Sequence, residues 1–253
     1  MNADPLYISS EFFHFFGRSS PLDHEGNYSL LKAVLESGCI SHPPHEVGAG
    51  KVSYSLDLSK RLAREEMLIP TVTCYCDIRY DHLAPHMAKY GTFGLSFSRH
   101  LLTKMGARPV IYIPCRPDDY LGVFTGHTLL KELEATFIGI HEHSETLQKD
   151  TPESSNSVLL CTSPKNLREV LAKTEHTLAL RVLAFVKPYE STLDDSDPKY
   201  YYSEREWRKL GNFQFEPDDV LRVIVDPSFV ERARDEIKGF SDRLYPAPND
   251  CQF

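Results

Sequence analysis

TVTCYCDIRYDHLAPHMAKYGTFGLSFSRHLLTKMGARPVIYIP, residues 71–114, is the stretch that decides the fold. Three runs rich in β-branched and aromatic residues alternate along it with two segments that have a helical pattern. We expect strands at 71–78, 93–98 and 108–114, and helices at 82–91 and 98–106. Gly91 ends the first helix and Pro114 ends the last strand. Strands and helices that alternate at this spacing predict a mixed α/β core.

The flanking sequence adds further elements to this core. Strands are expected at 11–17, 178–188 and 218–226, and helices at 27–38, 127–143, 163–176 and 227–240. Two of these helices fall in a predicted helical insertion at residues 115–175. We therefore expect a single mixed α/β (α+β) domain over residues 1–253, with a twisted β core, the insertion and a flexible tail at 244–253.

The composition narrows the class of protein. The 253 residues carry a formal net charge of −8, and 41% of them are hydrophobic and 25% charged, as in ordinary globular proteins. The acidic balance argues against a generic basic clamp for nucleic acids. We expect no signal peptide at the start of the sequence, and no apolar run approaches the ~20 residues of a membrane helix.

The cysteines predict a reduced, cytoplasmic protein. Six are spread along the chain without a C-x-x-C pair. Cys74 and Cys76 precede His82 and His86, which raises the question of a zinc site. The spacer from Cys76 to His82 is too short for an ordinary zinc finger. We therefore predict buried thiols, a surface pair of histidines and no metal site.

YYYSEREWRKL (200–210) holds two glutamates beside the only tryptophan of the chain. If this segment is a strand, Glu204, Glu206 and Arg208 share one face, and two carboxylates roughly 7 Å apart can reach one ligand. If it is a helix, Glu204 and Arg208 form an ordinary surface pair at i and i+4. The spacing alone leaves both interpretations open.

Several motifs resemble those of a known family. They occur in a fixed order: CYCDI (74–78), HMAKYGTFGLSFSR (86–99), RPVIYI (108–113), KPYE (187–190) and SEREWR (203–208). With them the sequence resembles the AbiGi-type abortive phage-infection family over most of residues 10–230. Members are often labelled antitoxins, a name that comes from a two-gene phage-defence locus. The resemblance implies an anti-phage protein whose partner is a cognate toxin or antitoxin.

The layout is also similar, at the level of the fold, to ADP-ribosyltransferases. That fold places a histidine or arginine on an early strand, an aromatic or hydroxyl residue on a central strand, and a glutamate, often within E-x-E, on a late strand. The matching candidates are His14, then Tyr90 or Ser96, then Glu204 and Glu206. The sequence departs from the pattern where Phe follows His14, and TVTCYCDI competes with FGLSFS as the central strand.

This similarity implies NAD as a co-substrate. Glu206 would stabilise the positive charge that develops on the ribose when the nicotinamide–ribose bond breaks, and Glu204 would orient or deprotonate the acceptor. The other assignments are His14 on the adenosine-side ribose, Tyr90 on the nicotinamide, Ser96 as the alternative central residue, and Arg208 or Arg61 on the pyrophosphate.

Two functions from different classes follow. The first is an NAD-dependent ADP-ribosyltransferase-like effector, a toxin that modifies a protein or nucleic acid. The alternative is a non-enzymatic antitoxin or phage-sensing binding module, in which EREWR (204–208) is a structural salt bridge with a tryptophan anchor. A cleft that holds His14 and Glu206 favours the enzyme, whereas a broad exposed apolar patch favours the binding module.

Overall fold

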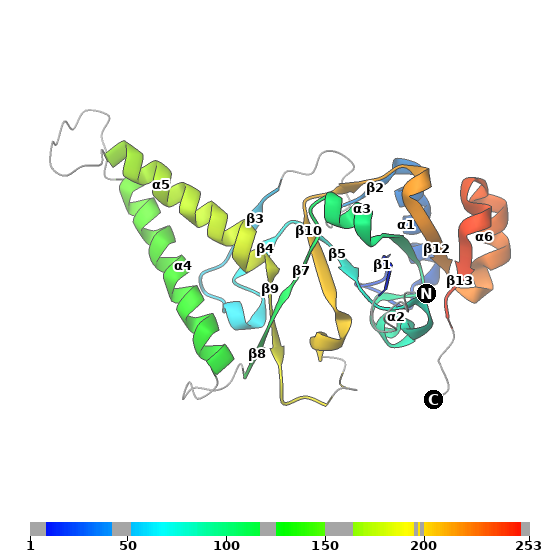
Figure 1. Cartoon of the computed structure of the whole chain (residues 1–253), viewed down its shortest axis with the longest axis horizontal. Coiled ribbons are helices and arrows are strands. Elements are labelled where there is room, and N and C mark those ends of the chain that lie inside the picture. The colour runs from blue at the N-terminus through cyan, green and yellow to red at the C-terminus, as the bar shows by residue number, and fades with distance from the viewer. Residues whose placement is uncertain are drawn as a thin grey trace, which may run out of the picture. The chain divides into compact units, whose positions relative to one another are not determined.

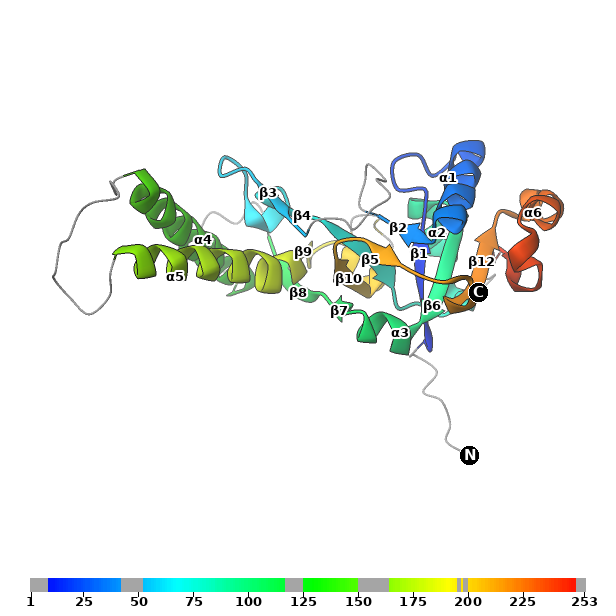
Figure 2. The same cartoon turned by 90° about the horizontal axis from the view of Figure 1, so that it is seen from above.

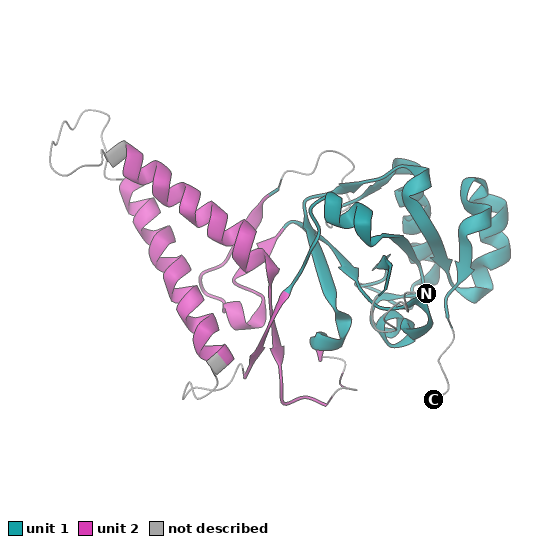
Figure 3. Ribbon diagram, viewed as in Figure 1, with its two compact units in different colours: residues 1–52, 71–110, 201–253 teal, residues 53–70, 111–200 magenta. Residues whose placement is uncertain are grey.

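The computed structural model describes residues 9–41, 52–116, 125–149, 164–194, 197 and 200–248. The chain forms two compact units (Figure 3). Unit 1 comprises residues 1–52, 71–110 and 201–253, and unit 2 comprises residues 53–70 and 111–200. Each unit contains helices and strands, so the predicted mixed α/β fold class is confirmed.

Unit 1 is built on a seven-stranded sheet with the order β13-β12-β6-β1-β5-β10-β7 (Figure 1). The strands are β1 (Glu11–Phe15), β5 (Val72–Cys76), β6 (Gly94–Ser98), β7 (Arg108–Pro109), β10 (Glu206–Leu210), β12 (Val220–Val225) and β13 (Leu244–Pro246). Neighbouring strands are antiparallel except β12 and β13, which are parallel. The stretch predicted as a tail therefore begins with a strand, and its residues 249–253 lie outside the described residues.

The described residues of unit 1 also form four α-helices, several 3₁₀ turns and a two-stranded ribbon. The α-helices are α1 (His24–Ser37), α2 (Ala84–Tyr90), α3 (Arg99–Lys104) and α6 (Val230–Glu236), and the ribbon is β2 (Cys39–Ile40) paired to β11 (Phe213–Gln214). The Asp23 carboxylate caps the start of α1, and Gly38 ends that helix in the left-handed conformation with φ of 62°. The Ser98 hydroxyl accepts from the Leu101 N–H and starts α3 directly after β6.

The two faces of the sheet bury different side chains, because neighbours along a strand point to opposite faces. On β1, Phe12 packs into the larger core, to which α1 contributes Tyr28 and Leu31. Phe13 and Phe15 pack on the other face, in a smaller cluster with Met87 of α2. The predicted strand 11–17 is thus buried on both sides, which explains its many phenylalanines.

Unit 2 contains two pairs of strands and a pair of antiparallel helices (Figures 1 and 2). The strands β3 (Tyr54–Leu56) and β4 (Leu68–Pro70) are antiparallel, and β8 (Ile111–Cys115) and β9 (Val186–Glu190) are parallel. The helices α4 (Thr125–Lys149) and α5 (Pro164–Thr177) pack against each other. The first lies inside the predicted insertion at 115–175, and the second ends two residues beyond it. Among the described residues no helix is both long and apolar enough to cross a membrane.

Three predicted elements differ from the structure. The apolar run 178–188 is wrong as a single strand: it forms a π-helical turn (Leu178–Val182) and a 3₁₀ turn (Leu183–Phe185) before β9 begins. A short buried apolar run fits a helix as well as a strand, so its pattern cannot distinguish them. The strand predicted for 108–114 is divided between β7 and β8, which belong to different sheets. The closing helix of 227–240 is regular only at α6.

Candidate functional site

The segment that carries the two glutamates changes conformation between them. Residues Tyr201–Glu204 form a 3₁₀ turn, and β10 begins at Glu206. Arg205, between the two glutamates, has a φ of 47°, which is uncommon for a residue with a side chain. The segment is therefore neither the continuous strand nor the helix that the sequence left open, and Glu204 and Glu206 are both buried, at 4% and 7% exposure.

Asp77 holds this turn at two points. Its N–H donates to the Arg205 carbonyl over 3.2 Å, and its carboxylate accepts from the Arg205 guanidinium over 3.1 Å. The Asp77 carboxylate also accepts from Arg99 over 3.2 Å and is itself buried. A buried carboxylate between two guanidiniums is a strong anchor, because charge-assisted hydrogen bonds are about twice as strong as neutral ones.

Glu206 forms a buried ion pair with Arg208 on the same face of β10. Arg208 Nε lies 2.7 Å from Glu206 Oε1, and Arg208 Nη2 lies 3.5 Å from Oε2. The intervening Trp207 points to the other face, where its ring packs 4.6 Å from that of Phe12. This arrangement matches the salt bridge and tryptophan anchor expected for a structural role.

Glu204 is bound by residues of α2. The Tyr90 hydroxyl donates to Glu204 Oε1 over 2.8 Å, and Lys89 Nζ lies 3.5 Å from the same oxygen. Burial and the charge of Glu204 raise the pKa of Tyr90 far above its ordinary value of 10, so the phenol stays protonated and donates. The structure thus brings Tyr90 and Glu204 together, although the tyrosine acts through its hydroxyl.

His86 is a neighbour that the sequence analysis placed on the surface. Its ring lies 4.5 Å from that of Tyr90 and 5.5 Å from that of Phe15. Burial lowers the pKa of His86 to about 3, so the imidazole is neutral at pH 7. The signal was present in the sequence: His86 and Tyr90 are four residues apart on α2 and therefore share one helix face.

The other predicted site residues lie elsewhere. Along the sheet, the direct pairs Glu206–Cys76 and Phe13–Cys76 place Glu206 on the face of Phe13, so the next residue, His14, points to the opposite face. The His14 ring nitrogen Nδ1 lies 2.7 Å from the Cys74 carbonyl oxygen.

Ser96 is on the same face as Glu206 but stands three strands away, roughly 14 Å at the usual strand spacing. Its hydroxyl donates to Glu11 over 2.7 Å. Arg61 belongs to unit 2, where it pairs with Glu134 at 2.7 Å. Within unit 1, His14 and Ser96 therefore do not assemble with Glu206, and the roles assigned to all the NAD-site candidates stay predictions.

No disulfide joins the described cysteines Cys39, Cys74, Cys76 and Cys115 to one another. Burial raises the pKa of Cys76, so this thiol is protonated and unreactive. Within the described parts of the chain no group of three or more histidine, cysteine or acidic side chains could hold a metal ion. Cys161 and Cys251 lie outside the described residues.

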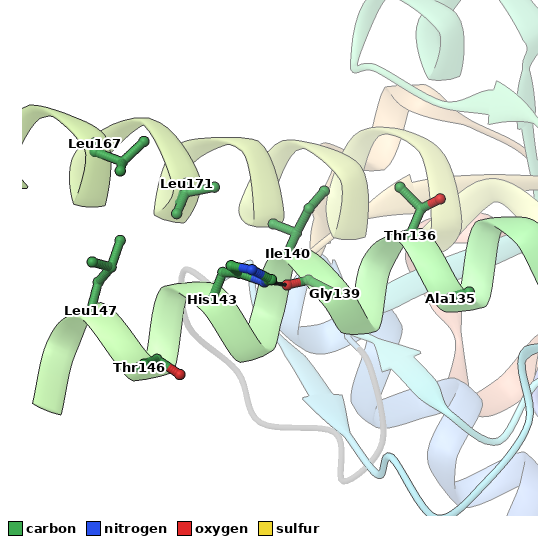
Figure 4. Close-up of a pocket in the computed structure, with 9 residues that line it drawn as sticks. All are labelled: Ala135, Thr136, Gly139, Ile140, His143, Thr146, Leu147, Leu167 and Leu171. Carbon is green, nitrogen blue, oxygen red and sulfur yellow. Dashed lines mark hydrogen bonds between the residues drawn. The ribbon is translucent and has the colours of Figure 1, made fainter. Parts of the chain in front are cut away.

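A second candidate site is a groove between α4 and α5 in unit 2. It has a volume of about 580 Å³, and Figure 4 shows Leu167 and Leu171 of α5 facing Ile140 and Leu147 of α4. The remaining lining residues are Ala135, Thr136, Gly139, His143 and Thr146. The sequence predicts both helices but not the groove, because the spacing of side chains does not show which helix faces remain exposed to solvent after folding.

Comparison with known proteins gives one match. A family model described as "Putative abortive phage resistance protein AbiGi, antitoxin" matches residues 46–238. No curated protein and no solved structure matches the chain, so the resemblance to ADP-ribosyltransferases remains a prediction. Since the family model matches well over half of the sequence, the chain belongs to the AbiGi family of abortive phage resistance proteins.

Proposed function

We propose that the chain is a non-enzymatic antitoxin that neutralises a cognate toxin by binding to it. The observation that carries this proposal is the match to a family described as an antitoxin, over residues 46–238. These residues include the segment of the two glutamates and both helices of the groove.

The contacts of the two glutamates support a structural role. Glu206 is paired with Arg208 at 2.7 Å, and Glu204 accepts from Tyr90 at 2.8 Å. A carboxylate that stabilises a cationic transition state must direct its charge at the reacting group. A guanidinium already in contact offsets that charge, and a hydrogen-bonded phenol occupies one of the acceptor sites. EREWR then anchors β10 in the sheet instead of acting on a ligand.

Co-expression tests the proposal. Bacteria would express the toxin alone, the toxin with the wild-type chain, or the toxin with a Tyr90→Phe variant, which loses the hydroxyl and keeps the ring. We expect the wild-type chain and the variant to restore growth equally and to co-purify with the toxin, at a constant cellular NAD level. Arrest of growth by the wild-type chain alone, with transfer of ADP-ribose to a cellular target, would overturn the proposal.

An ADP-ribosyltransferase-like effector is the second candidate. The observation that favours it is the grouping of Tyr90, Glu204 and Glu206 beside the neutral imidazole of His86. NAD would be its co-substrate, and its target a protein or nucleic acid. This candidate requires that the chain alone is toxic, that the toxicity consumes NAD, and that Glu206→Gln abolishes both effects while the protein remains folded.

A further inference from the structure

The groove between α4 and α5 is elongated along α4. Its residues on α4 run from Ala135 to Leu147, a distance of roughly 18 Å at 1.5 Å per residue. On α5 the lining residues Leu167 and Leu171 are one turn apart. The groove is thus lined by three turns of α4 on one side and by two leucines of α5 on the other. Such a groove suits a helix that presents apolar side chains at helical spacing.

The chemistry of the lining favours a protein segment over a small polar molecule. Ile140, Leu147, Leu167 and Leu171 provide most of the walls. Of the polar lining residues, His143 has its Nδ1 2.7 Å from the Gly139 carbonyl oxygen, within its own helix. Sites for small metabolites normally combine an apolar wall with several converging polar groups. Here the polar groups are two threonines and this histidine, which leaves apolar contact as the main attraction.

The apolar surface continues beyond the groove. The lining residue Leu167 is 43% exposed, and Val170, outside the lining on the next turn of α5, is 56% exposed. Leu129 near the start of α4 is 44% exposed. Exposed apolar side chains that extend a groove are typical of protein interaction sites. There is also open space above Gly139 of α4, because a Cβ added at this residue would meet no atom within 4 Å.

Two exposed glutamates lie beside the groove. Glu132 precedes Ala135 and Thr136 by one turn, so it lies along the lining face of α4, and Glu142 stands one turn after Gly139. Both glutamates are exposed. Two other glutamates of these helices are already paired, Glu134 with Arg61 at 2.7 Å and Glu175 with His141 at 2.9 Å. The two exposed glutamates at the lining face favour a partner with basic side chains.

We infer that this groove receives an amphipathic helix of the cognate toxin, with apolar residues at helical spacing and lysine or arginine on its flanks. The inference rests on the proposed antitoxin function and deepens it by assigning the contact surface. Apolar side chains of the toxin helix fill the space over Gly139 between the leucines. Its cations approach Glu132 and Glu142, which sets the orientation of the helix.

The test fills the groove without disturbing the fold. Gly139→Leu puts a side chain where space is open, and leucine has a higher helix propensity than glycine. Gly239→Leu is the matched control, because a Cβ there also meets no atom within 4 Å and the position lies in unit 1. Binding of the full-length chain to the purified cognate toxin is measured by calorimetry. We expect Gly139→Leu to raise Kd at least tenfold and Gly239→Leu to leave it within twofold.

A charge-reversed variant provides an independent reading. Glu132→Lys with Glu142→Lys changes exposed side chains only, so it preserves the fold, and we expect it to raise Kd at least tenfold at low salt and less at high salt. If both Gly139→Leu and the double lysine variant bind the toxin as tightly as the wild-type chain does, the groove is not the contact surface. The antitoxin function still stands in that case, because the wild-type chain binds the toxin. No binding by the wild-type chain overturns both. Sedimentation tests whether the groove binds a second copy instead. If the wild-type chain self-associates, and Gly139→Leu abolishes this self-association without altering toxin binding, the groove belongs to a second copy and the inference is overturned.

Discussion

Replacing only one member of the Glu206–Arg208 ion pair should lower the free energy of unfolding far more than replacing both members. Both side chains are 9% exposed, and Nε and Oε1 are 2.7 Å apart. Replacing one member by methionine leaves the other charge buried without its nearest counter-ion, which costs about 3–5 kcal/mol. Two methionines fill a similar volume and carry no charge, so the double variant should lie within about 1 kcal/mol of the wild type. The coupling energy of the pair is then at least about 5 kcal/mol.

Urea unfolding of the wild type, the two single variants and the double variant measures this coupling. Trp207 is the only tryptophan and lies between the two residues, so its fluorescence reports on this part of unit 1 directly. The exposed pair of Glu231 and Arg234 is the control, and its coupling should stay below about 1 kcal/mol. Single substitutions whose costs simply add in the double variant would refute the reasoning, because they would show that the two charges do not stabilise each other.

Three further predictions concern the core, a helix end and a titrating group of unit 1. Phe97→Ala should lower the free energy of unfolding by about 3–5 kcal/mol, because its fully buried ring packs against Phe213 and Phe215; a urea midpoint near that of the wild type would contradict this. Gly38→Ala should cost about 1 kcal/mol or more, since φ is 62° and the new Cβ would lie 2.8 Å from the Phe215 carbonyl oxygen; thermal unfolding measures it. The pKa of His86 is about 3 when folded and near 6.5 when unfolded, so stability should fall as pH drops below 6.5, by up to about 1.4 kcal/mol per pH unit. His86→Leu should weaken this dependence between pH 7 and pH 5, and equal slopes in the two proteins would count against it.

The parts of the fold that the sequence predicted well are those with strong local signals. β5 and β6 combine aromatic and β-branched residues, and α3 starts at a serine cap directly after β6. Where local signals were weak or equivocal, tertiary contacts decided. The apolar run at 178–188 satisfies either a strand or a helix, and only its last part pairs with β8. The run at 108–114 is divided because its first part pairs with β10, to which Val110 still donates its N–H at the Glu206 carbonyl, whereas from Ile111 onwards it pairs with β9.

The candidate site was less predictable than the fold. The spacing left a strand and a helix open, and the strand alternative holds for Glu206 and Arg208, which share a face of β10, but not for Glu204, which lies in the preceding 3₁₀ turn. The spacing could not show that His14 points to the other face, because that depends on which residue of β1 stands opposite Cys76. Nor could the spacing predict the left-handed backbone conformation at Arg205. That conformation is stabilised by hydrogen bonds to Asp77, which is far away in the sequence. Which side chains meet across the sheet depends on the register between paired strands. That register is set by two segments together and cannot be predicted from either one alone.

The order of strands in unit 1 also affects how the chain can fold as it leaves the ribosome. β10 lies between β5 and β7, yet it follows both in the sequence by roughly a hundred residues. Until β10 has been synthesised, β5 and β7 each present an unpaired backbone edge of the kind that recruits other strands. The nascent chain must therefore carry an open sheet throughout the synthesis of unit 2. Pairing of β10 with β5 and β7 is a late event, and β12 and β13 follow it to cover the edge of β6, so these last strands end the period in which open sheet edges favour aggregation.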